Sequence, residues 1–132
     1  MKPHFDNQLS LTPNRDGRTW KLDHGFGYYA GQGQFVLVPA QFKTDLASIP
    51  QIFWNILPPF GKYTGAAVIH DWCYRTHLFP RSRCDAILFQ AMGISGVPLW
   101  QRLIIYLNVR AFGWLAWRNE SRWQKHFTHL KK

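Results

Sequence analysis

The chain has 132 residues, of which 46% are hydrophobic and 17% aromatic. That is enough for one domain with a real core, and it excludes a disordered chain. Lys and Arg total 16 against 7 Asp and Glu, so the formal charge of +9 favours an acidic partner such as nucleic acid, anionic lipid or an acidic protein surface. We expect neither a signal peptide nor a transmembrane helix, because polar residues follow Met1 directly and the apolar stretch 99–117 contains Gln, Arg and Asn.

The first third of the chain predicts short β-strands. Residues 1–17 are polar and contain turn residues, so we expect an N-terminal arm or loop. Strand-like runs follow at 19–22, 27–30 and 34–38, with a further short run at 42–46, in a β part that spans 18–47. The glycines of Gly31-Gln32-Gly33 favour a hairpin turn between two of these runs.

From Ser48 onward the pattern is helical. We expect a short helix over 48–57 capped by Ser48, a second over 64–77, a third from Pro80 to about Gly93, and a fourth from Pro98 to about Arg118 or Phe127. Strands come first and helices after, in one domain over 1–132 whose helical part covers 48–127. This order predicts an α+β fold, with a small N-terminal antiparallel hairpin or sheet followed by three to four packed helices.

The helix over 64–77 carries the candidate chemistry. Helical spacing puts His70, Cys73 and Tyr74 on one side, beside Ala66 and Ala67, whose small side chains let another helix approach closely. This side of the helix is therefore expected to face the next one.

The third helix must fold back because its connection is short, which brings Cys84 and Asp85 near the second helix. A carboxylate bonded to one imidazole nitrogen fixes the tautomer and leaves the other nitrogen as a base, so Asp85 could orient His70. Asp71 could hold a hard divalent cation.

Plainer interpretations stay open for each of these residues. Asp85 has capping-box spacing from Ser82, and His70 and Asp71 could simply pack and pair with an Arg. Asp45 fits a turn. Buried free thiols, one disulfide, or a zinc site are all compatible with the spacing of His70, Cys73, His77 and Cys84.

The fourth helix ends in a run of Trp and Arg residues. Their spacing predicts a partly exposed aromatic-basic face for a membrane or protein partner, whereas a core helix with snorkelling arginines is the alternative. The residues of this face are Trp114, Trp117, Arg118, Arg122 and Trp123.

Two motifs carry family resemblances. The segment from Val38 to Pro50, which contains Asp45, followed by the His-Asp-Trp helix, resembles the phage-associated family known as domain of unknown function 1353 over about residues 22–117. That resemblance implies a phage or prophage origin, in the virion or the host cytoplasm, and it makes Asp45 a candidate for a further carboxylate of the site.

The segment His70-Asp71-Trp72-Cys73-Tyr74 resembles the His-Asp-any-Cys-Tyr helix of secreted calcium-dependent phospholipases of the A type. The resemblance implies that His70 activates water, that Asp71 binds calcium, and that Tyr74 bonds the orienting Asp85. It also implies that Cys73 pairs with Cys84. The chain departs from those enzymes because its glycines at 25–33 fit a hairpin rather than a calcium loop.

The hypothesis from the sequence is a phage-encoded hydrolase of an ester, phospholipid-like, with a His-Asp dyad and metal assistance by calcium, or less favourably zinc. A non-enzymatic virion or tail component, which binds phage structural proteins, is the first alternative. A basic nucleic-acid-binding module is the second, although no recognised binding motif is present.

Overall fold

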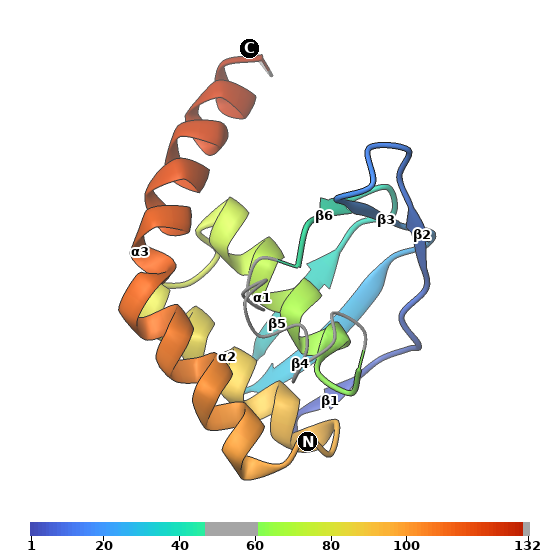
Figure 1. The fold of residues 1–132 in the computed structure, drawn as a ribbon, viewed down its shortest axis with the longest axis vertical. Coiled ribbons are helices and arrows are strands. Elements are labelled where there is room, and N and C mark those ends of the chain that lie inside the picture. Colours follow the sequence, from blue (N-terminus) through green and yellow to red (C-terminus); the bar gives the residue numbers. More distant parts are fainter. Residues whose placement is uncertain (47–60, 131–132) are drawn as a thin grey trace.

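The computed structural model describes residues 1–46 and 61–130, with side chains up to Arg118. In this part of the chain, six short strands precede three helices, which confirms the predicted α+β class (Figure 1). The helix predicted over 48–57 and its cap Ser48 lie outside the described residues.

One sheet has the strand order β1-β4-β5, built from β1 (His4–Phe5), β4 (Phe26–Gly31) and β5 (Gln34–Val38), all antiparallel. The predicted hairpin joins β4 and β5. Its two turn residues, Gln32 and Gly33, both have positive φ, 55° and 74°, which is the backbone that suits the twist of a two-residue hairpin.

The second sheet has the order β2-β3-β6, from β2 (Leu11–Pro13), β3 (Trp20–Leu22) and β6 (Lys43–Thr44). The expectation of an arm or loop over 1–17 is therefore wrong in part, because β1 and β2 lie within it. These strands are two and three residues long, too short for an alternating pattern to be visible. Pro13 is tolerated because β2 is an edge strand.

The helices are α1 (Thr64–Thr76), α2 (Arg81–Ile94) and α3 (Leu99–Leu130). α1 packs against both α2 and α3 and also contacts β5. Figure 1 shows α3 running along the outside of the other two helices, with its C-terminal part extending beyond them. The predicted helices agree closely in their boundaries, and α3 extends three residues past the longer predicted end.

The core lies between the β1-β4-β5 sheet and the paired helices α1 and α2. α1 fills it with a run of four small or aliphatic residues, Ala66 to Ile69, none more than 1% exposed. Such a run is apolar on all sides, which is typical of a helix enclosed by other elements. Burial on every side of α1 fixes the position of its next residue, His70.

Within the described residues, none of the helices combines the length and the apolar character needed to cross a lipid bilayer.

Candidate functional site

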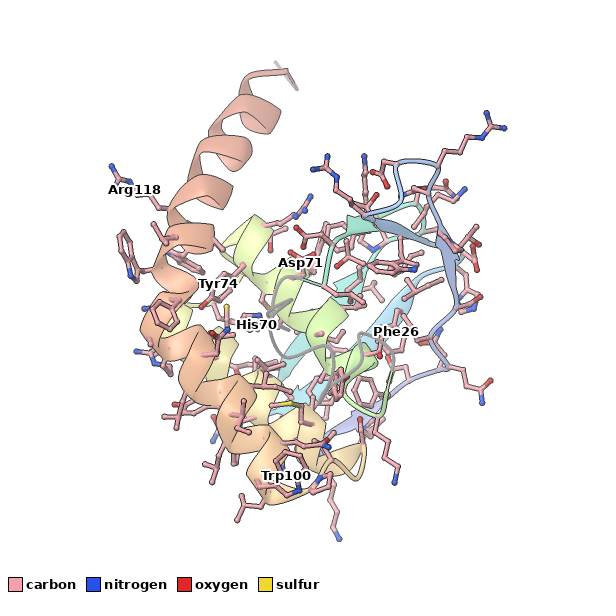
Figure 2. All side chains as sticks on the ribbon, viewed as in Figure 1. Phe26, His70, Asp71, Tyr74, Trp100 and Arg118 are labelled. Carbon is pink, nitrogen blue, oxygen red and sulfur yellow. The ribbon has the colours of Figure 1, made fainter. Side chains whose placement is uncertain are left out.

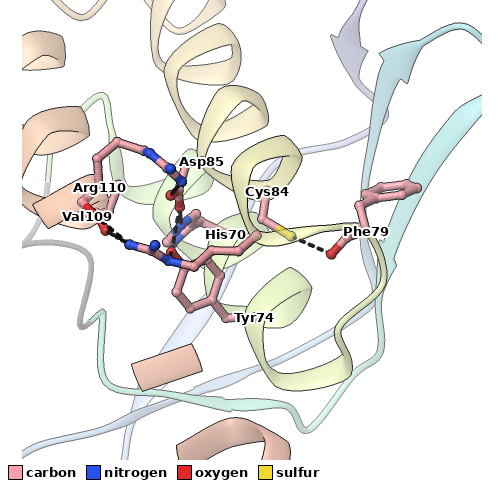
Figure 3. Close-up of polar contacts among 8 residues, drawn as sticks. His70, Tyr74, Phe79, Cys84, Asp85, Val109 and Arg110 are labelled. Atoms are coloured by element: carbon pink, nitrogen blue, oxygen red, sulfur yellow. Dashed lines mark hydrogen bonds and ion pairs between the residues drawn. The ribbon is translucent and has the colours of Figure 1, made fainter. Parts of the chain in front are cut away.

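His70 and Asp85 are in direct contact across the α1–α2 interface. His70 Nε2 lies 2.7 Å from Asp85 Oδ1, and the two residues are 3% and 0% exposed (Figure 3). A carboxylate only accepts, so Nε2 carries the hydrogen and donates it. The sequence-predicted pair is thus brought together with the geometry that fixes an imidazole tautomer.

Two further side chains donate hydrogen bonds to the Asp85 carboxylate. The Tyr74 hydroxyl donates to the same Oδ1 at 2.6 Å, and Arg110 Nη1 from α3 donates to Oδ2 at 2.7 Å. Burial alone would raise the pKa of Asp85, but hydrogen bonds from His70, Tyr74 and Arg110 outweigh it and lower that pKa below its ordinary value. The group therefore stays a carboxylate at neutral pH, and it can stabilise positive charge on the imidazole.

The capping-box interpretation of Asp85 is wrong. α2 begins at Arg81 after the N-cap Pro80, whose cap makes no side-chain hydrogen bond. Because the helix begins at Arg81, Asp85 lies one turn inside it and faces inward. Its carboxylate there accepts hydrogen bonds from side chains of α1 and α3.

Sequence reasoning did not identify the contribution of α3. Besides Arg110, Arg81 donates from Nε to the Tyr74 hydroxyl at 3.1 Å and from Nη2 to the carbonyls of Val109 and Arg110 at 2.7 and 2.8 Å. The arginine therefore ties α2 to α3. In the sequence, the only sign of the contribution of α3 was Arg110, an arginine within an apolar helix, and that pattern equally fits a snorkelling side chain.

Gly113 makes room for this network. A Cβ at that position would lie 2.7 Å from the Tyr74 hydroxyl and 3.4 Å from Arg81 Nη2. The absence of a side chain lets the Tyr74 hydroxyl rest against the backbone of α3 while it donates to Asp85.

Asp71 lies on a different side of α1 and is 8% exposed. Its carboxylate accepts from the Thr44 hydroxyl at 2.6 Å and from Arg75 Nε at 3.4 Å. Burial raises its pKa above the ordinary value, and the nearby charge of Asp45 raises it further, against the opposing effects of Arg75, Thr44 and His70. Asp45 itself is exposed and close enough to act on Asp71.

These donors do not fit a calcium ion. Calcium takes six to eight oxygen ligands, whereas Asp71 here meets a guanidinium and a hydroxyl that donates to it. Over the part of the chain that the structure describes, no three His, Cys, Asp or Glu side chains converge as a metal-binding group. The four residues of the zinc alternative therefore do not form such a group either.

Cys73 and Cys84 are both buried and both free thiols. A hydrogen bond with Cys84 and burial raise the pKa of the Cys73 thiol, and Cys84 Sγ lies 3.4 Å from the Phe79 carbonyl oxygen. The predicted adjacency of the two cysteines across α1 and α2 is therefore present, with both side chains behaving as small hydrophobic groups.

His77 lies at the end of α1, away from the Asp85 network. Its ring stacks on Trp117, with centroids 3.6 Å apart and planes 5° from parallel, and its Nε2 lies 3.1 Å from the Trp117 carbonyl oxygen. Trp117 also packs edge-on against Tyr74. These contacts make Trp117 half-buried, whereas Trp114 is 47% exposed and Arg118 is exposed (Figure 2). The side chains of Arg122 and Trp123 lie outside the described residues.

The fold and the site define an α+β protein in which α1, α2 and α3 enclose a His-Asp-Tyr-Arg network centred on one carboxylate. The chain belongs to the family described as "Protein of unknown function (DUF1353)", whose model matches residues 20–109. This range contains His70, Tyr74 and Asp85, and it extends to the residue before Arg110.

Two curated relatives come from Sinorhizobium fredii. The uncharacterized protein y4jT is 33% identical over 96 residues, which cover 71% of this chain and 29% of y4jT. The uncharacterized protein y4iH is 31% identical over 94 residues, 70% of this chain and 39% of y4iH. The chain thus spans about a third of the length of these relatives. No solved structure matches significantly.

Proposed function

We propose that the protein is a hydrolase of esters, including phospholipid-like esters, in which His70 is the general base. The observation that carries the proposal is the 2.7 Å hydrogen bond from His70 Nε2 to Asp85, whose same oxygen also accepts from Tyr74. A buried carboxylate that holds one imidazole nitrogen is the arrangement that makes the other nitrogen a base.

In this mechanism Nδ1 is the basic nitrogen, because Nε2 carries the hydrogen that it donates to Asp85. Nδ1 takes a proton from water as the water oxygen attacks the ester carbonyl carbon. The imidazolium then returns that proton to the departing alcohol as the carbon–oxygen bond breaks. Asp85, with its lowered pKa, stabilises the positive imidazolium between the two steps. Tyr74 and Arg110 are positioning residues that hold the carboxylate.

The resemblance of the His-Asp-Trp-Cys-Tyr helix to calcium-dependent phospholipases supports this choice of reaction. Cys73 and Cys84 are adjacent free thiols, not the disulfide that the resemblance implies. The contacts of His70 and Tyr74 agree with the roles that the resemblance implies. The contacts of Asp71 do not, so calcium has no part in the mechanism proposed. A phage or prophage origin, implied by the resemblance of the Val38–Pro50 motif, belongs to the same proposal.

The test is ester hydrolysis with a p-nitrophenyl ester and with short-chain phospholipid. We expect His70→Gln to lower kcat/KM by about 100-fold or more, the usual contribution of a general base, while circular dichroism and the melting temperature stay close to wild type. The matched control is His77→Asn on the same helix. His77 lies outside the Asp85 network, and Asn tolerates its left-handed backbone, φ 50°.

Two results would overturn the proposal: a wild-type chain that hydrolyses none of these esters, or a folded His70→Gln variant that retains full activity. Either would favour the second candidate, a non-enzymatic virion or assembly component with a purely structural network. The exposed apolar side chains of α3 favour that candidate independently.

A further inference from the structure

The outward side of α3 is apolar along its first half. Seven neighbouring positions that are exposed carry only Leu, Trp or Ala, and they fall within an arc of about 160° at 100° per residue. They are Leu99, Trp100, Leu103, Leu107, Ala111, Trp114 and Leu115. We call this set the α3 outer face. Its opposite side is buried, with Ile105 and Val109 at 0% and 3% exposed.

The α3 outer face is nearly symmetric around Leu107, with Leu opposite Ala as the one unequal pair. Leu99 and Leu115 lie eight residues on either side of it, Trp100 and Trp114 seven, and Leu103 and Ala111 four. Two copies of such a helix, placed antiparallel across a twofold axis at Leu107, would set each residue opposite the one that lies equally far on the other side of Leu107. This self-complementarity is what an interface between identical chains requires.

The sizes of the side chains also match in that arrangement. Leu–Leu and Trp–Trp pairs form the ends, and the large Leu103 meets the small Ala111, as interlocking helices require. The face runs over about 24 Å of helix, and its Leu and Trp side chains are 42–61% exposed.

Charge argues for a protein partner over a lipid one. Arg102 is turned inward, where Nε donates to the Val97 carbonyl at 3.0 Å and the guanidinium stacks on Phe89. Arg110 is bonded to Asp85. Among the described side chains of α3, this leaves Arg118 as the cation at the rim of the face. A surface that binds anionic lipid needs many cationic side chains.

From these observations we infer that the protein forms a homodimer through antiparallel packing of the α3 outer faces of two copies. The antiparallel arrangement also separates the two basic C-terminal ends, which limits the repulsion between chains that each carry +9. The inference is independent of the proposed hydrolase activity.

The experiment is sedimentation equilibrium of the full chain over a wide range of concentration. We expect a dimer, and we expect Leu107→Glu to raise the dissociation constant by about 30-fold or more, the loss typical of a central interface residue. Phe112→Glu is the matched control. Phe112 is 65% exposed on the same helix but lies about 140° around it from Leu107, so its dimer should persist.

Engineered cysteines test the orientation. Leu107→Cys on the twofold axis should cross-link to itself under mild oxidation, whereas Leu99→Cys should cross-link only to Leu115→Cys in a mixture of the two variants. A monomeric wild type, a dimer insensitive to Leu107→Glu, or efficient self-cross-linking of Leu99→Cys would overturn the inference. So would a monomer that binds phosphatidylglycerol vesicles through this face.

Discussion

Asp85 is fully buried, and its two oxygens together accept hydrogen bonds from an imidazole, a phenol and a guanidinium. Each donor comes from α1 or α3, so one carboxylate satisfies polar groups of both neighbouring helices. The same bonds keep the carboxylate ionised. The structural role of this residue and its proposed catalytic role therefore depend on the same bonds, and they must be separated by measuring stability and activity on the same variants.

Asp85→Ala should destabilise the protein by about 3–5 kcal/mol, because removing one partner of a buried ion pair leaves the others unpaired. Asp85→Asn should cost less, since the amide oxygen still accepts a hydrogen bond. Urea unfolding measures both. If Asp85→Ala were as stable as wild type, the network would not hold the helices together.

Replacing Asp71 should change the stability in the opposite direction to replacing Asp85. Its folded-state pKa is raised, so ionising it costs stability at neutral pH, and this cost disappears as pH falls below the ordinary carboxyl value near 3.9. Asp71→Asn should therefore be more stable than wild type at neutral pH, with the difference shrinking as pH is lowered. Thermal unfolding across this range measures it. A difference that grows toward acid would contradict the raised pKa.

Chelation tests whether calcium binds at Asp71, as the sequence predicted. Because Arg75 already supplies a positive charge to this carboxylate, we expect EDTA to leave both activity and melting temperature unchanged. If calcium raised the melting temperature of wild type and had no effect on Asp71→Asn, a metal site at Asp71 would be established.

At the scale of elements, Gly113 controls how closely α3 approaches α1. Ala in a helix is ordinarily more stable than Gly by about 1 kcal/mol, but here its Cβ would lie 2.7 Å from the Tyr74 hydroxyl. Gly113→Ala should therefore destabilise the protein, by about 1–3 kcal/mol as in other overpacked sites. Tyr74→Phe removes the clashing oxygen, and we expect the double variant to recover part of the loss.

Gly93 provides the control. A Cβ there would meet the end of the Arg102 side chain at 3.2 Å, which can move, so Gly93→Ala on α2 should be neutral or stabilising. Chemical denaturation of the four variants compares them. Equal effects at the two glycines would mean that the contact between Tyr74 and α3 is not tight.

The sequence predicted α1 and α2 well because both have distinct boundaries, an apolar pattern and a short connection. That connection was sufficient to place Asp85 near His70. β1 and β2 were missed because two or three residues carry no periodicity. Arg81 and Arg110 were not placed in the site because their partners are a hydroxyl on α1, a buried carboxylate on α2 and two carbonyls on α3, which come within reach only when the three helices pack together.

At the scale of the whole molecule, the charge of +9 bears on the choice of substrate. If phospholipid-like esters are hydrolysed, positive potential should concentrate an anionic interface near the protein. We expect faster hydrolysis on phosphatidylglycerol than on phosphatidylcholine vesicles, with the difference falling as salt rises and screens the charge. Equal rates at low salt would show that the charge serves another partner.

The central claim is that Asp85 holds His70 as the Nε2–H tautomer, on which the proposed role of Nδ1 as the base depends. Nitrogen-15 NMR of the imidazole, with His70 assigned by comparison with His70→Gln, reports the protonation of each nitrogen directly. We expect the neutral imidazole to carry its hydrogen on Nε2 and not on Nδ1, with this preference lost in Asp85→Ala. A His70 that carries its proton on Nδ1 in the wild-type protein would contradict it.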